Sequence, residues 1–142
     1  MAKPEAALLH PSRFAFVHDI TTRFADLDPN GHINNVAMAA VFEDGRVRFI
    51  QGAGFREALG ALRFMVVSVG IDYLAQAHFP GPLTCHTAAL SVGTSSWTIQ
   101  QLVLQSGAPV ATARTTVVCT DGLRPVALPD PLRTLLEPWL MK

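Results

Sequence analysis

The chain has 142 residues, 49% of them apolar, and its 11 lysines and arginines balance its 11 aspartates and glutamates. This length suits one domain with a sizeable core, so we expect residues 1–142 to form a single domain. With zero net charge and no lysine between Lys3 and Lys142, the chain offers no basic footprint for a phosphate backbone, which excludes nucleic acid as the expected partner.

Residues 1–12 mix alanines, prolines and one charge pair, which predicts a loose lead-in and no signal peptide. No apolar run approaches the ~20 residues that span a membrane, so we expect a cytoplasmic protein. Cys85 and Cys119 fall inside expected strands and are interpreted as buried thiols, not as a disulfide. The low charge content favours an oligomer that buries part of its surface.

The first expected strand covers residues 14–24, where apolar and polar side chains alternate imperfectly. Residues 35–51 predict a helix, because Met38, Phe42 and Gly45 fall at positions i, i+4 and i+7. The first half of this helix is apolar nearly all round, so other structure must enclose it. Its alanines and Gly45 would let that structure pack very closely.

After a short turn over residues 55–61 the pattern changes to period two, which predicts four more strands in meander order. These strands are expected at residues 62–74, 83–92, 96–105 and 108–119. In the first of them, Met65 and Ile71 are expected on one face, with Phe64, Val66 and Asp72 on the other. Residues 123–142 form a proline-rich tail with a helical turn.

This order of elements predicts an α+β fold in which an antiparallel sheet of about five strands wraps around a long central helix. Such a sheet leaves an edge in need of cover. Pairing with an identical sheet across a two-fold axis would supply it, and would bring a site at the start of the helix close to the subunit interface.

Residues 26–35 read DLDPNGHINN and place two carboxylates, three carboxamides and an imidazole directly before the helix. Asn34 or Asn35 can cap the helix, whose first N–H groups lack partners and favour negative charge. The loop is therefore interpreted as an active-site loop, with a plain turn and cap as the alternative. Asp26 is expected to be a turn residue.

A calcium loop is a remote alternative for the same stretch. Asp26, Asp28, Asn30 and Gly31 match the first positions of an EF-hand, but the twelfth position is Ala37, where a bidentate glutamate is required. No helical pattern precedes the loop either. The sequence therefore argues against a metal site here.

The same loop heads an apolar helix that runs on through Phe42-Glu43, and Ile71-Asp72-Tyr73-Leu74 follows later. Together they resemble the hot-dog-fold acyl thioesterases of the 4-hydroxybenzoyl-CoA thioesterase and acyl-ACP thioesterase kind, over about residues 22–121. The resemblance implies hydrolysis of a thioester between an acyl group and coenzyme A or an acyl-carrier protein. It also implies a homodimer or homotetramer that uses no metal and no cofactor.

By this resemblance the catalytic aspartate falls on Asp28, and the catalytic asparagine and histidine of the acyl-ACP branch fall on Asn30 and His32. A carboxylate can deprotonate water as a general base or attack the thioester carbonyl as a nucleophile. Backbone N–H groups at the start of the helix could hold the developing oxyanion. These groups belong to Asn34, Asn35 and Val36.

Two departures separate the chain from both branches. The acyl-ACP branch uses a further acidic residue after the position of Tyr73, where this chain has Gln76, and the hydroxybenzoyl branch lacks the histidine. Glu43, Tyr73 and Gln76 are interpreted as supporting polar groups, and His78 as structural. A hot-dog protein that binds acyl-CoA without hydrolysing it, or a hydratase, remains an alternative function.

Overall fold

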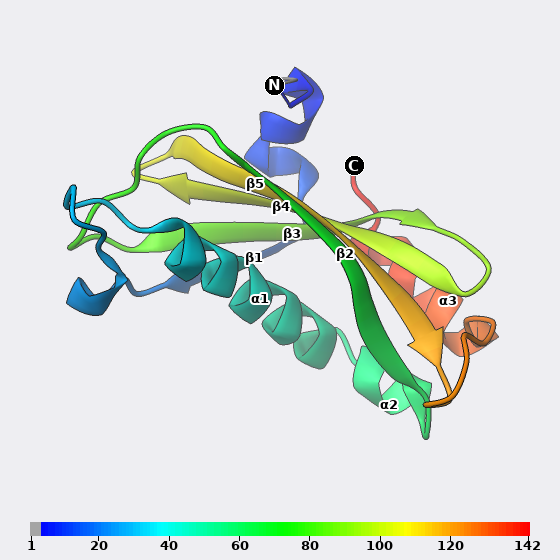
Figure 1. Ribbon diagram of the computed structural model, residues 1–142. Helices are drawn as coiled ribbons and strands as arrows, with labels where there is room; N and C mark the ends of the chain where they lie inside the picture. Colours follow the sequence, from blue (N-terminus) through cyan, green and yellow to red (C-terminus); the bar gives the residue numbers. More distant parts are fainter. Residues whose placement is uncertain (1–3) are drawn as a thin grey trace.

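A five-stranded antiparallel sheet curls around helix α1 in the computed structural model, which describes residues 4–142 (Figure 1). The order of strands across the sheet is β1-β3-β4-β5-β2. The strands are β1 (Phe16–Ile20), β2 (Arg63–Tyr73), β3 (Leu83–Val92), β4 (Ser96–Gln105) and β5 (Ala108–Thr120). The helices are α1 (Asn35–Gly52), α2 (Phe55–Leu59) and α3 (Asp130–Leu136), with 3-10 turns at η1 (Ala6–Leu9), η2 (Pro11–Arg13), η3 (Phe24–Asp26) and η4 (Glu137–Trp139). The predicted α+β fold with a central helix is confirmed.

Strands β3, β4 and β5 form a meander because short turn sequences separate their apolar runs. The turn between β4 and β5 consists of Ser106 and Gly107, both with positive φ, at 51° and 79°. Two positive φ values in a two-residue loop match the right-handed twist of the flanking strands. The predicted bounds of β3 and β4 are confirmed to the residue.

Helix α1 lies on the concave face of the sheet and buries one side against it (Figure 1). The helix begins after Asn34, whose side-chain oxygen accepts a hydrogen bond from the Ala37 N–H at 2.7 Å. Gly45 faces the sheet, and a Cβ atom there would lie 2.7 Å from both Cys85 Sγ and Gln101 Nε2. The expected close packing at Gly45 is therefore confirmed.

Strand β2 differs from the prediction in which side chains share a face. A bulge between Val66 and Ser68 shifts the register with β5, so the strict alternation breaks in mid-strand. Phe64 and Ile71, expected on opposite faces, both pack toward the core around α1. Five large apolar side chains of this strand are exposed to solvent. They are Met65, Val66, Val67, Val69 and Tyr73.

Helix α1 also departs from expectation along its length. Its first half was expected to be enclosed, yet Val36 is 74% exposed because the sheet covers only one side of the helix. Arg46 is only 8% exposed, although arginine side chains are mostly exposed in proteins. Burial lowers the pKa of its guanidinium below the ordinary value.

The chain ends meet on the convex face of the sheet, opposite α1 (Figure 1). No regular structure was expected before Arg13, but residues 6–13 form the 3-10 turns η1 and η2. The Arg13 side chain donates to the carbonyls of Ala7 and Lys142, and Phe14 packs over Leu102. Among the helices of residues 4–142, none combines the length and apolar character needed to cross a membrane.

Candidate active site

The loop before α1 is a tight turn closed by its own backbone. The Asp28 N–H donates to the His32 carbonyl at 2.8 Å, and the Gly31 N–H donates to the Asp28 carbonyl at 3.0 Å. Gly31 adopts a φ of 79°, a left-handed conformation that glycine reaches without strain. The Ile33 N–H donates to the Ala77 carbonyl at 2.8 Å, which ties the turn to the segment after β2.

The half-buried Asp28 carboxylate is held at the centre of this turn. One oxygen, Oδ1, accepts hydrogen bonds from the N–H groups of Asn30 at 2.8 Å and His32 at 3.1 Å. The other oxygen, Oδ2, has no hydrogen-bond partner among the described residues. The turn therefore fixes the direction of the carboxylate and leaves one oxygen available to a water molecule or a substrate.

The start of α1 supplies free donors beside this carboxylate. Asn34 is occupied as the helix cap, so its side chain serves the Ala37 N–H, and Asn34 N–H donates to the Asp26 carbonyl at 2.8 Å. The N–H groups of Asn35 and Val36 have no acceptor within residues 4–142. The first N–H groups of a helix point outward and favour negative charge.

His32 and His78 come together although they are far apart in the sequence. Their ring centroids lie 5.2 Å apart, with the planes at 70°. The hydrogen bond from the Ile33 N–H to the Ala77 carbonyl brings the two histidines together. No local sequence pattern predicts this contact. His78 was interpreted as structural, and the structure shows that it lies against a candidate catalytic histidine.

The expected supporting groups are dispersed. The Tyr73 hydroxyl donates to the Asn35 carbonyl at 3.1 Å, so Tyr73 reaches the start of α1. Gln76 is exposed and precedes Ala77, whose carbonyl accepts a hydrogen bond from Ile33 in the loop before α1. Glu43 is exposed on α1, about 12 Å along the helix from Asn35 at ~1.5 Å per residue, and does not join Asp28 within one chain.

Asp26 is a structural residue, as expected. Its carboxylate accepts from the Arg23 side chain at 2.8 Å and from the Arg23 N–H at 2.9 Å. These hydrogen bonds hold the pKa of Asp26 below its usual range, with the side-chain bond from Arg23 as the largest cause. Asp26 thus serves the turn, whereas no cationic side chain of residues 4–142 forms an ion pair with Asp28.

Other chemistries find less support in this structure. Burial in the core raises the pKa of the Cys85 thiol to about 12, so it stays protonated and is a poor nucleophile. Burial also raises the pKa of Cys119. Within residues 4–142, no three histidine, cysteine or acidic side chains gather closely enough to hold a metal ion.

An apolar surface extends away from the start of α1 between the helix and β2. It consists of Val36 and Val47 on α1 and Val66, Val69 and Tyr73 on β2, with exposed fractions of 44 to 74%. We call these five residues the apolar strip. A strip of this kind next to a polar turn offers an environment for an acyl chain, a partner surface, or both.

A sheet wrapped around one helix, with a carboxylate fixed at the start of that helix, places this protein in the hot-dog fold class. The family model described as Thioesterase-like superfamily matches residues 22–136, and the chain belongs to that superfamily.

Two solved structures and one curated protein are similar to this chain. A predicted thioesterase from Bacillus stearothermophilus is 28% identical with a TM-score of 0.80, covering 89% of this chain and 97% of that one. A thioesterase from Thermus thermophilus, whose crystal structure contains coenzyme A and zinc, is also 28% identical with a TM-score of 0.80, covering 89% and 95%. The uncharacterized protein YsmA of Bacillus subtilis is 29% identical over 89 residues, which span 63% of this chain and 60% of YsmA. The chain thus matches less than two thirds of that curated relative.

Proposed function

We propose that this protein hydrolyses acyl thioesters of coenzyme A, with Asp28 as the catalytic carboxylate. The observation that carries the proposal is the Asp28 side chain, which two backbone N–H groups fix through Oδ1 while Oδ2 stays free. Asp26, two residues earlier, is instead paired with Arg23. A thioesterase of similar fold has been crystallised with coenzyme A, which supports this carrier.

Asp28 can act in thioester hydrolysis by two mechanisms. As a general base, Oδ2 removes a proton from water while the water oxygen attacks the thioester carbonyl and the thiolate leaves. As a nucleophile, Oδ2 attacks that carbonyl, expels the thiolate and forms an anhydride, which water then cleaves. In both routes the carbonyl oxygen becomes negative, and the N–H groups of Asn35 and Val36 are suited to hold it. His32 and Asn30 are proposed to contact the substrate from the same turn.

The apolar strip is proposed to serve both the acyl group and a second copy of the chain. Strand β2 lies at the edge of the described sheet, and an exposed apolar edge is a template for pairing. Antiparallel pairing of two β2 strands would form a homodimer, cover the strip and enclose the acyl chain. We keep the cytoplasm as the expected compartment of this dimer.

Replacement of Asp28 tests the catalytic assignment. Asp28→Asn retains an oxygen that can accept the two N–H bonds of the turn, so the loop should keep its shape while the charge is lost. We expect turnover of a suitable acyl-CoA to fall by at least ~100-fold, with an unchanged melting temperature. Asp130→Asn, an exposed carboxylate on α3, is the matched control.

The substrates should include aromatic, short-chain and long-chain acyl-CoA, with acyl-carrier-protein versions beside them. Near-normal turnover by Asp28→Asn would remove Asp28 from the mechanism. Acyl-CoA binding by the wild type without turnover of any substrate would indicate a binding protein. Light scattering tests the dimer, and a mass equal to the 15.3 kDa of one chain at all concentrations would contradict the β2 interface.

A further inference from the structure

The backbone of His32 is fixed in the turn before α1, but its ring has no polar anchor. The His32 N–H donates to Asp28 Oδ1 at 3.1 Å, and the His32 carbonyl accepts from the Asp28 N–H at 2.8 Å. Neither ring nitrogen of His32 forms a hydrogen bond with any residue of 4–142. Both nitrogens are therefore free to meet a substrate, and the direction of the ring depends on what packs against it.

The ring of His78 packs against the ring of His32. The two centroids lie 5.2 Å apart and the planes meet at 70°, which is an edge-to-face arrangement. Flat rings prefer this arrangement because the positive edge of one faces the electron-rich face of the other. The contact restricts rotation of the His32 ring, but only if His78 is itself held in place.

Gln105, the last residue of β4, holds the backbone of His78. Its Oε1 accepts from the His78 N–H at 2.8 Å, and its Nε2 donates to the His78 carbonyl at 2.8 Å. The same Nε2 also donates to the Gly81 carbonyl at 3.4 Å. One carboxamide thus satisfies both backbone groups of His78, as a neighbouring strand would. A residue 27 positions away in the sequence therefore fixes the backbone that carries the His78 ring.

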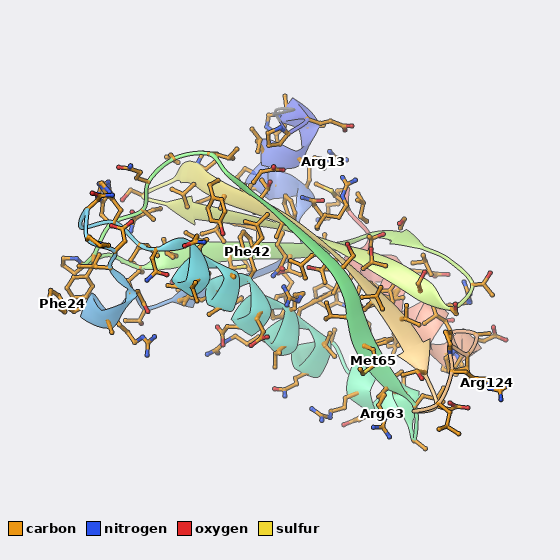
Figure 2. The ribbon with its side chains drawn as sticks, viewed as in Figure 1. Arg13, Phe24, Phe42, Arg63, Met65 and Arg124 are labelled. Atoms are coloured by element: carbon orange, nitrogen blue, oxygen red, sulfur yellow. The ribbon has the colours of Figure 1, made fainter. Side chains whose placement is uncertain are left out.

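The residues on either side of His78 are tied to the segment that leads into α1. The Ala77 carbonyl accepts from the Ile33 N–H at 2.8 Å. The Phe79 ring packs edge to face on Phe24 of η3, with centroids 6.1 Å apart and planes at 80°. Phe24 lies at the end of the molecule where α1 begins (Figure 2). His78 is thus held between two anchors on this segment as well as by the side chain from β4.

We propose that His78, with its backbone held by Gln105, is a positioning residue that orients the His32 ring toward the thioester bound at Asp28. This inference rests on the proposed function and adds two residues that act through His32. His78 makes and breaks no bond: Asp28 still activates water or attacks the carbonyl, and the thiolate still leaves. A ring held in one direction keeps its nitrogen at the substrate, and loss of such alignment slows a reaction.

Substitution of His78 tests the ring contact. His78→Ala removes the ring, so kcat for an acyl-CoA substrate should fall roughly 3–10-fold while KM changes less than about 2-fold, because alignment matters most in the transition state. His78→Phe keeps a flat ring without nitrogen atoms and should recover most of the lost kcat. His10→Ala, an exposed histidine between η1 and η2, is the matched control and should leave kcat unchanged. Activities are compared where all variants have the circular dichroism of the wild type. Unchanged kcat in His78→Ala, or equal losses in His78→Ala and His78→Phe, would overturn the proposal.

A double-mutant cycle tests whether His78 acts through His32. His32→Ala removes the ring that His78 orients, so adding His78→Ala to it should lower kcat no further. Losses that multiply would show that His78 acts on the substrate or the fold by itself, and would overturn the positioning role. Gln105→Ala frees the backbone of His78, so it should lower kcat and add nothing to His78→Ala. A multiplied loss in that pair would overturn the part assigned to Gln105.

A measurement without turnover separates this proposal from the catalytic one. Carbon-13 relaxation of ring-labelled histidine reports the order of the His32 side chain in the free protein. We expect an ordered His32 ring in the wild type and in His78→Phe, and a mobile ring in His78→Ala. If the wild type hydrolyses no thioester while His78→Ala loosens the His32 ring, the hydrolysis proposal fails and the positioning contact stands. Equal order of the His32 ring in the wild type and in His78→Ala would overturn the positioning role, whatever the activity.

Discussion

Replacement of Gly45 by alanine measures how closely α1 lies on the sheet. The added carbon would stand 2.7 Å from both Cys85 Sγ and Gln101 Nε2, closer than Cβ atoms approach other atoms in proteins. Gln101 is not free to swing away, because Nε2 donates to the Phe42 carbonyl at 3.1 Å and to Thr87 Oγ1 at 3.2 Å. Either the helix must lift from the sheet, or these buried hydrogen bonds must break.

The magnitude follows from these contacts. Overpacking in a core costs about 1–3 kcal/mol. Loss of a buried hydrogen bond costs about 1–3 kcal/mol as well. Alanine returns about 1 kcal/mol through its higher helix propensity than glycine. We therefore expect Gly45→Ala to lower the free energy of unfolding by about 2 kcal/mol and the Tm by roughly 5–8 °C.

Urea and thermal unfolding at one fixed protein concentration measure this change, since a dimer makes stability depend on concentration. Gly52→Ala is the matched control, because a Cβ there would meet the Phe16 ring at 3.4 Å, an ordinary contact. The combination of Gly45→Ala with Cys85→Ala should cost less than the sum of the two single changes. A Gly45→Ala protein as stable as the wild type would refute the close approach of helix and sheet.

Three further outcomes are expected. Asn34→Ala should lower the free energy of unfolding by about 1 kcal/mol, because the Ala37 N–H loses its capping oxygen. Asn34→Asp keeps that oxygen and should be as stable as the wild type. Equal stability of the wild type and both variants would contradict the cap. The Cys85 thiol, with its pKa raised to about 12, should resist a disulfide reagent at pH 8 until urea unfolds the protein, and rapid native-state labelling of Cys85 would show the opposite. Arg23 lowers the folded-state pKa of Asp26 below its ordinary value of 3.8, so this carboxylate contributes stability above that value and loses it as pH falls through the folded pKa. Urea unfolding of Asp26→Asn should thus depend less on pH in the acid range, and an unchanged acid dependence would remove Asp26 as its source.

Several elements of this fold could be predicted from local sequence alone. A period-two pattern between short turn sequences predicted residues 83–92 and 96–105 as strands, because side chains on a strand alternate between the two faces of a sheet. The spacing of Met38, Phe42 and Gly45 likewise predicted α1 and the side that meets the sheet. These signals are local, so each can be recognised without knowledge of the rest of the chain.

Other features had no local signal. No residue type in β2 signals its bulge. The bulge shifts the register with β5 and so places Ile71 on the same side of the sheet as Phe64. The contact of His32 with His78 depends on a backbone bond between two segments about 45 positions apart, so alternation along either segment could not reveal it. Arg46 is another such feature, because the charge of an arginine favours solvent, whereas the position of Arg46 on α1 leaves it only 8% exposed.

For the candidate site, the sequence by itself placed the turn, its two carboxylates and the start of α1 at one point of the chain. The sequence already favoured Asp28 over Asp26, and the tertiary structure supplied the contacts that separate them. Arg23 pairs with Asp26, while two N–H groups orient Asp28 through Oδ1 and no residue of 4–142 bonds to its other oxygen. The physical reason is that residue type and spacing determine which groups are near in sequence. The direction of each side chain, and the partner that neutralises it, depend on how the folded backbone turns.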